Sequence, residues 1–229
     1  MQAFSGDCAS TLAALEARIT SCRACARLVE WRERVAQEKR AAFAGETYWG
    51  RPVPGFGDPE ARVYVLGLAP AAHGGNRTGR VFTGDRSADF LYASMHRTGF
   101  ANQPTSTHPG DGLRLTGAWV TAAVRCAPPA NKPTPTERDT CLPYAREELE
   151  LLTGVRVAVC LGKFAWDAAA RLHSIRPLPR FGHGAEHGIP GGPVLLGCFH
   201  PSQQNTFTGR LTEPMMDAVF LRAREMAAG

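Results

Sequence analysis

Four short apolar runs constrain the fold of this chain more than any other feature. They read RVYVLGL, AWVTAAV, VRVAVCLG and PVLLGCF, and they occupy residues 62–68, 118–124, 155–162 and 193–199. Each run has the length of a strand and contains branched residues, and apolar residues follow one another without alternation, which is typical of strands buried on both faces. The sequence therefore predicts a sheet that is covered on both sides.

Segments with helical spacing separate these runs. They include 87–100 and 163–173, and the segment 134–152 begins with the capping residue Thr134, although Pro143 is expected to bend or restart this helix. Strands that alternate with helices form right-handed crossovers between parallel strands. We therefore predict an α/β fold, a three-layer α/β/α sandwich with a central four-stranded parallel sheet, built as a single domain over residues 1–229.

The N-terminal part, about residues 1–45, has helical spacing and a dense basic face, interrupted near Ser21. No run approaches the roughly 20 apolar residues of a membrane helix, and the N-terminus lacks the charged-then-apolar pattern of a secretory signal. Basic residues exceed acidic residues by 26 to 21, which favours a polyanionic partner. We expect a cytoplasmic, nucleoid-associated monomer.

Three loops directly follow strands, at 69–85, 125–135 and 200–210. In parallel sheets ligands bind beyond the carboxyl ends of the strands, so these loops are expected to converge on one cleft. The first loop is rich in glycine but has neither the G-x-G-x-x-G spacing nor the G-K-[ST] of a phosphate cradle. It lets a ligand approach the backbone closely, with Phe82 available for stacking and Asp85 for chemistry.

Three polar side chains in these loops also fit structural roles. Asp85 could cap a helix that begins at Ser87, and Asn131 could simply form a turn. His200 directly follows a strand, where histidines are more often structural than catalytic. The polar residues that share its loop, such as Ser202, favour a functional role.

The seven cysteines divide into two groups. An odd number without a secretory signal argues against a disulfide framework. Cys160 and Cys198 lie in apolar strands and are interpreted as core residues, and Cys8 near the terminus as inert. The other four have the number that either a tetrahedral zinc or a [4Fe–4S] cluster requires, although simple packing of these side chains stays an alternative. They are Cys22, Cys25, Cys126 and Cys141.

Four motifs together resemble one known family. The combination of GLAPAAHG, FTGD, RCAPPANKPTP and HPSQQNTFTGR resembles the uracil-DNA glycosylase superfamily, and within it family 5, the iron–sulfur-containing group of broad base specificity. The likeness extends over nearly the whole chain, from SCRACARLVEWRE to the last helix. It implies a monofunctional DNA-repair glycosylase that flips a base out of DNA and hydrolyses the N-glycosidic bond of uracil and of other deaminated bases, such as hypoxanthine and xanthine. It also implies a structural [4Fe–4S] cluster on the four cysteines.

The resemblance assigns roles to individual residues. Related families align the hydrolytic water with a polar residue early in the first motif, where this chain has Leu68, Ala69 and Pro70, as family 5 would, so water activation is assigned to Asp85. Ala122 replaces an asparagine that selects uracil in related families, which fits relaxed specificity. The implied site consists of Asp85, His200 and Asn131 for catalysis; Phe82, Gly67, Leu68, Ala69 and His73 around the base; Arg77, Arg80, Ser202, Asn205, Phe207 and Arg210 on DNA; and Cys22, Cys25, Cys126 and Cys141 on the cluster.

Two other functions stay open at this point. The chain could be an iron–sulfur DNA-binding protein without catalysis, an alternative that the uncharged GLAPA supports. It could also be a metal-dependent nucleotide hydrolase, although the glycine-rich surroundings of His183 and His187 deny that pair a helix. The opening motif has no lysine that could form the Schiff base of a lyase.

Overall fold

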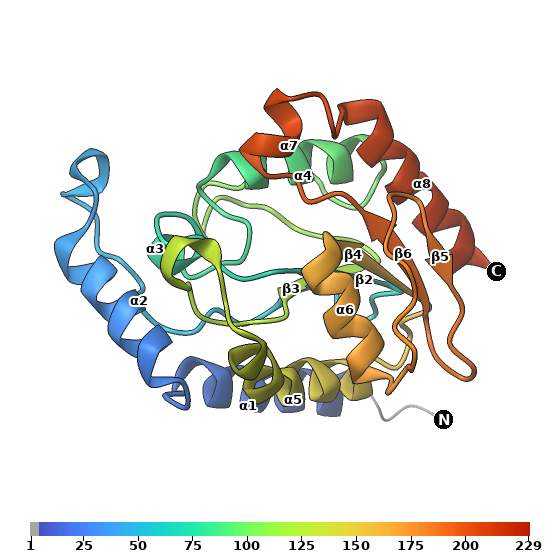
Figure 1. Ribbon diagram of the computed structural model, residues 1–229, viewed down its shortest axis with the longest axis horizontal. Coiled ribbons are helices and arrows are strands. Elements are labelled where there is room, and N and C mark those ends of the chain that lie inside the picture. Colours follow the sequence, from blue (N-terminus) through green and yellow to red (C-terminus); the bar gives the residue numbers. More distant parts are fainter. Residues whose placement is uncertain (1–4) are drawn as a thin grey trace.

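The four apolar runs form the parallel centre of one sheet. The computed structural model describes residues 5–229, with side chains from residue 11 on, and Figure 1 shows the sheet between layers of helices. The strand order is β1-β3-β2-β4-β6-β5; the inner four strands are parallel, and the two outer ones pair antiparallel with their neighbours. The predicted four-stranded parallel sheet is confirmed, with a short edge strand added on each side. The strands are β1 (Phe56–Gly57), β2 (Val63–Gly67), β3 (Ala118–Ala122), β4 (Val157–Leu161), β5 (Glu186–His187) and β6 (Val194–Cys198).

Helices cover both faces of the sheet, as the three-layer prediction requires. Residues of two helices belong to the core cluster on one face, and residues of three belong to the cluster on the other; Figure 1 shows helices on both sides of the sheet. The first pair is α4 (Arg86–Arg97) and α8 (Glu213–Ala228), and the second group is α1 (Ser5–Thr20), α5 (Pro135–Leu151) and α6 (Lys163–Leu172).

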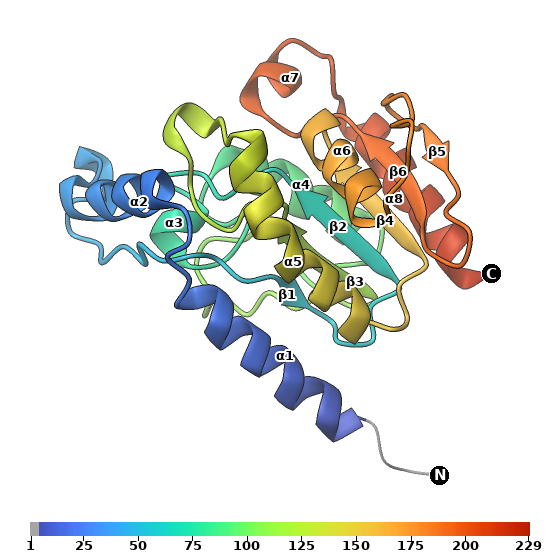
Figure 2. The same ribbon diagram turned by 60° about the horizontal axis from the view of Figure 1, so that its bottom comes forward.

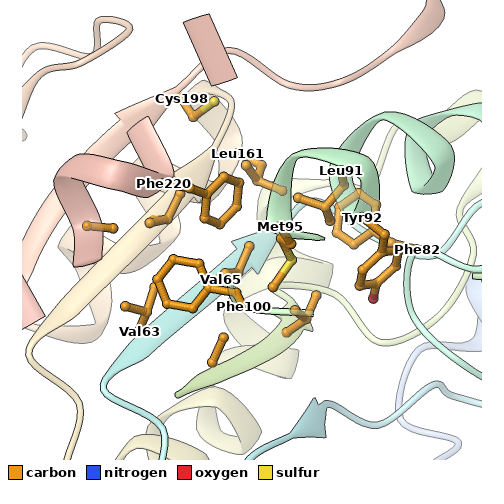
Figure 3. Packing of buried hydrophobic residues seen from close by; sticks show 14 of the residues in the cluster. Val63, Val65, Phe82, Leu91, Tyr92, Met95, Phe100, Leu161, Cys198 and Phe220 are labelled. Carbon is orange, nitrogen blue, oxygen red and sulfur yellow. The ribbon is translucent and has the colours of Figure 1, made fainter. Parts of the chain in front are cut away.

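Alternating side chains of the strands divide the core in two. Val63 and Val65 of β2 belong to the cluster that contains Phe220 of α8 (Figure 3). Tyr64 and Leu66 point to the other face and pack in the cluster of α5 and α6. Because both faces are covered, every residue of β2, β3 and β4 is buried, which explains the unbroken apolar runs.

The N-terminal segment consists of two helices, with the predicted break near Ser21. α1 ends at Thr20, and α2 (Ala26–Glu38) continues in a different direction toward α3 (Gly75–Thr78) (Figure 2). Of the expected segment 1–45, residues 1–4 lie outside the described part of the chain. The break at 21–25 carries the C-x-x-C pair.

Helix α5 begins as predicted but does not restart at its proline. The Thr134 hydroxyl accepts a hydrogen bond from the Glu137 amide at 3.1 Å, and the Glu137 carboxylate accepts one from the Thr134 amide at 2.8 Å, which is a capping box. The helix then runs through Pro143 to Leu151. Pro143 is exposed while Leu142 is buried, so core packing keeps this segment helical although proline lacks one helical hydrogen bond.

Three short helical turns complete the chain. They are η1 (Ala41–Phe43), η2 (Pro129–Asn131) and α7 (Gln203–Phe207). Within the described residues, no helix combines the length and the apolar character needed to cross a bilayer.

Candidate active site

A cavity of about 570 Å³ lies where the parallel strands end. Leu68, Phe82 and Asp85 line it from the loop after β2, Asn131 from the loop after β3, and His200 from the loop after β6. The predicted convergence of three strand-end loops is therefore confirmed. The volume is in the range of pockets that bind small organic molecules.

Phe82 has an unusual backbone conformation at the wall of this cavity. Its φ angle is 48°, in the left-handed region that bulky residues rarely adopt. The ring packs directly on Gly67, because a Cβ at Gly67 would lie 2.6 Å from Phe82 Cε2 and 2.7 Å from Cζ. Figure 3 shows Phe82 beside Tyr92, at the edge of the core cluster. The glycine that ends β2 therefore makes room for the aromatic ring.

His200 is a neutral imidazole in this environment. Burial lowers the pKa of His200 to about 4, so its ring carries no charge at pH 7. The centroids of the His200 and Phe82 rings lie 6.1 Å apart, and Asn205 Nδ2 donates a hydrogen bond to the backbone carbonyl of His200 at 2.9 Å. Asn205 thus holds the loop that carries the imidazole.

Asp85 caps a helix and lines the cavity at the same time. Its Oδ1 accepts a hydrogen bond from the amide of Ala88 at 3.0 Å, so Asp85 is the N-cap of α4. Its Oδ2 lies against Gly74, where a Cβ would overlap it. Burial raises the pKa of the Asp85 carboxyl above its ordinary value, although hydrogen bonds from the amides of Ala88 and Ser87 lower it. The capping interpretation and the functional one are therefore compatible.

The loops after β2 and β3 are joined beside the cavity. The backbone carbonyl of Leu68 accepts a hydrogen bond from the amide of Val124 at 3.1 Å, and Leu68 and Ala69 both line the cavity. Asn131 lies exposed at the cavity edge with a φ of 55°, next to Ala130 with a φ of 53°. Asparagine tolerates this conformation better than most residues, so the turn-forming role of Asn131 is real, and its side chain is still at the cavity.

Three residues expected at the base or on DNA lie elsewhere. His73 is absent from the cavity wall, and its Nδ1 lies 3.0 Å from the hydroxyl of Tyr48. Arg77 and Arg80 are only 9% and 7% exposed, and each guanidinium forms an ion pair with a carboxylate. The expectation for the two arginines differs from the structure because loop position alone does not reveal burial, whereas His73 is half-buried and lies beside Tyr48.

The loop after β6 presents exposed side chains next to the cavity. Ser202 caps α7 and lines the cavity, and Asn205 follows within the same helix. Phe207 is 69% exposed, and the guanidinium of Arg86 lies 5.7 Å from the centre of its ring. Arg210 is also exposed. Sequence reasoning missed Arg86, which lines the cavity; its position directly after Asp85 was an available signal.

The four cysteines singled out by their spacing line a single second pocket. Two come from the break between α1 and α2, one follows β3 and one lies in α5. Within the described part of the chain, no three His, Cys, Asp or Glu side chains are placed to hold one metal ion. In a [4Fe–4S] cluster each thiolate binds its own iron, so its ligands surround a larger body than one ion. The pocket-lining cysteines are Cys22, Cys25, Cys126 and Cys141.

A buried cation accompanies these thiols. Arg32 is 2% exposed, and its Nη1 donates to Cys126 Sγ at 2.8 Å, while its Nε has no hydrogen-bond partner among the described residues. The amide of Arg125 donates to Cys141 Sγ at 3.3 Å. Burial raises the pKa of Cys126 to about 11 and that of Cys141 to about 12. The positive charge and these donors fit an anionic metal–thiolate group, because they would offset its charge.

The remaining cysteines follow the sequence interpretation where they are described. Cys160 and Cys198 are fully buried in β4 and β6. The side chain of Cys8 lies outside the described residues.

Comparison with known proteins identifies relatives over nearly the full chain. Residues 54–224 match the family model described as "Uracil DNA glycosylase superfamily". The chain is 56% identical over 222 residues to the "Type-5 uracil-DNA glycosylase" of Mycobacterium tuberculosis, which covers 96% of this chain and 83% of the relative. It is 53% identical to the protein of that name in Mycobacterium leprae, with 96% and 97% covered. It is 54% identical to the one in Thermus thermophilus, with 91% and 95% covered.

Proposed function

The chain belongs to the uracil DNA glycosylase superfamily, and we propose that its strand-end cavity holds uracil flipped out of DNA. The activity is that of a uracil-DNA glycosylase, a hydrolase of DNA repair. The observation that supports the location is the cavity itself, which is lined by an aromatic ring, a neutral imidazole and a carboxyl group. A chromosomal substrate would place the enzyme at the nucleoid.

Entry of the base requires its removal from the stacked duplex, because the glycosidic bond cannot be hydrolysed in place. The exposed Phe207 is suited to fill the gap that the base leaves in the stack. Arg86, beside the Phe207 ring, and Arg210 are exposed and are suited to contact phosphates. Phe82 would then stack on the flipped base inside the cavity.

His200 would stabilise the departing base. Hydrolysis leaves negative charge on the base, and a fixed hydrogen-bond donor in a buried site stabilises that charge. Because the pKa of His200 is lowered to about 4 by burial, it acts as a neutral donor at pH 7, not as a cation. A neutral imidazole has one N–H to give, and the Asn205 bond to the His200 carbonyl keeps the loop in place while it does so.

Asp85 would act on the sugar side of the bond. Breaking the bond leaves positive charge on the sugar, which an ionised carboxylate offsets. The same carboxylate can accept a proton from the attacking water, a contribution of typically about 10²–10⁴-fold. Oδ1 accepts a hydrogen bond from the amide of Ala88, which holds the carboxylate at the cavity. Asn131 at the cavity edge could orient that water.

The second pocket would hold a [4Fe–4S] cluster. Cys22, Cys25, Cys126 and Cys141 would bind it, and Arg32 would offset its charge. When bound, the cluster supplies a structural joint, since its ligands come from the break between α1 and α2, the end of β3 and α5. We assign it no step in base release.

The pocket would also accept deaminated purines. Ala122 at the end of β3 is 2% exposed and is not among the residues that line the cavity, so this position presents no polar group that could select uracil. A pocket without paired polar groups rejects analogues weakly. We therefore propose activity on hypoxanthine and xanthine in addition to uracil. Release of uracil with neither of the other bases would contradict this extension alone.

The test is base excision by variants of Asp85 and His200. Asp85→Asn and His200→Gln should each slow the release of uracil from an oligonucleotide under single-turnover conditions. Asp89→Asn provides a matched control, because Asp89 lies in the first turn of the same helix and is exposed. If neither variant slowed release, the roles assigned to Asp85 and His200 would be wrong. If the unaltered protein bound DNA without releasing any base, a DNA-binding protein without catalysis would be the better description.

A further inference from the structure

The turn that carries Phe82 is held in a conformation that its own sequence disfavours. A left-handed φ of 48° at a phenylalanine costs free energy and persists only where the surroundings enforce it. One such contact lies directly before Phe82, where the hydroxyl of Tyr92 donates to the carbonyl of Val81 at 3.3 Å. The other contacts lead to a loop distant in the sequence.

Arg80 is the centre of those contacts. Its Nε donates to the hydroxyl of Thr83 at 3.0 Å, so the guanidinium bridges the two sides of Phe82. Its Nη2 donates to Ser106 Oγ at 2.8 Å and to Asp111 Oδ2 at 2.7 Å. Arg80 and the side chain of Asp111 are each only 7% exposed. The ion pair is therefore largely removed from solvent and cannot contact DNA.

The backbone after Phe82 is anchored to the same loop. The amide of Gly84 donates to the carbonyl of Ser106 at 2.8 Å, and the hydroxyls of Thr83 and Ser106 lie 2.7 Å apart. Together with Arg80, these bonds fix the turn on both sides of the phenylalanine.

Asp111 is in turn held by its own loop. Its Oδ2 accepts a hydrogen bond from the amide of Thr107 at 2.7 Å, and its Oδ1 accepts one from the amide of Leu113 at 3.0 Å. Burial alone would raise the pKa of Asp111, but the hydrogen bonds from Arg80 and from these amides hold it well below its ordinary value. The carboxylate therefore stays charged and oriented at any working pH.

We infer that Arg80 and Asp111 are positioning residues that clamp the Phe82 turn and so set the affinity of the cavity for the flipped base. The inference rests on the proposed stacking of the base on Phe82. Neither residue is among those that line the cavity, so their effect must pass through the aromatic ring.

The experiment measures KM and kcat for uracil release from a single-stranded oligonucleotide. Arg80→Met with Asp111→Leu removes both charges, so no buried charge is left unpaired. Base–aromatic stacking contributes to the binding of a base, so loosening the turn should raise KM by about tenfold with a smaller change in kcat. Arg80→Lys keeps the ion pair but cannot bridge Thr83 and Ser106 together. Its KM should lie between those of the unaltered protein and the double variant, and it remains informative if the double variant does not fold.

A double-mutant cycle with Phe82→Ala separates this role from a general loss of structure. Once the ring is absent, loss of the clamp should change KM by less than about twofold, because coupled changes are not additive. The control is Arg97→Met with Asp217→Leu, which removes another Arg–Asp pair, at 2.7 Å between α4 and α8; it should leave KM unchanged.

The possible results distinguish failure of the positioning role of Arg80 and Asp111 from failure of the proposed glycosylase function. If loss of the clamp, meaning the Arg80–Asp111 pair, raised KM by the same factor with and without Phe82→Ala, the positioning role of the pair would be wrong while the glycosylase assignment stayed intact. An unchanged KM in the Arg80 variants would also overturn the positioning role. If Phe82→Ala itself altered neither KM nor kcat, the stacking role and the clamp would both be wrong. If the unaltered protein released no uracil at all, the proposed function itself would be refuted.

Discussion

Substituting Gly67 by alanine should displace the ring that stacks on the base. A Cβ at this position would lie 2.6 Å from Phe82 Cε2, whereas carbon atoms in contact are about 3.5–4.0 Å apart. The ring must therefore move by about 1 Å. The ring is 8% exposed and its backbone turn is fixed, so the direction with free space is toward the cavity.

The expected loss of activity exceeds the loss of stability. Overpacking a core costs about 1–3 kcal/mol in the free energy of unfolding, which leaves a typical domain folded. A misplacement of about 1 Å at a reacting centre can cost about 10²-fold in rate. Gly67→Ala should therefore release uracil about 10²-fold more slowly in single-turnover assays, while urea denaturation shows a folded protein.

Gly188→Ala is the matched control for Gly67→Ala. A Cβ at Gly188 would meet no atom within 4 Å, so Gly188→Ala should match the unaltered protein in both assays. A Gly67→Ala protein with normal stability and a normal rate would show that the ring can yield without consequence. In that case Phe82 does not position the base.

The remaining predictions concern pH, a buried ion pair and the cysteines. The rate should fall as the pH falls through the raised pKa of Asp85, and this acid limb should be absent in Asp85→Asn. His200→Gln should lower the rate by about 10²–10³-fold for the loss of one donor, and equally at every pH from 5 to 9, because His200 with its pKa of about 4 stays neutral over that range. If this substitution shifted the acid limb of the pH–rate profile, the assignment of His200 as a neutral donor would be wrong. Glu148→Gln breaks the buried pair with Arg125, in which Nη2 lies 2.6 Å from Oε2, and should lower the free energy of unfolding by about 3–5 kcal/mol in urea titrations. Cys141→Ser should lower the iron content and visible absorbance of the purified protein, and unchanged iron would exclude Cys141 as a ligand.

The sequence alone was sufficient for the four parallel strands and for the loops that line the cavity. Apolar runs such as 62–68 are buried strands because a parallel sheet covered on both faces demands apolar residues at every position. Thr134 began a helix because its capping box involves only near neighbours. His200 and Asp85 reached one cavity because the loops after parallel strands share an edge. Each of these features depends on local pattern or on a general rule of topology.

Only the tertiary structure decided which polar residues face the ligand. Arg80 and Arg77 follow a strand in a glycine-rich loop, as a DNA contact would, yet both are buried in ion pairs. Arg80 meets Asp111 across 31 positions of the chain, and Arg32 meets Cys126 across 94. The left-handed turn at Phe82 depends on the same distant contacts. Local sequence determines secondary structure because its hydrogen bonds and side-chain spacing are short-range, whereas burial and charge pairing depend on which remote segments the fold brings together.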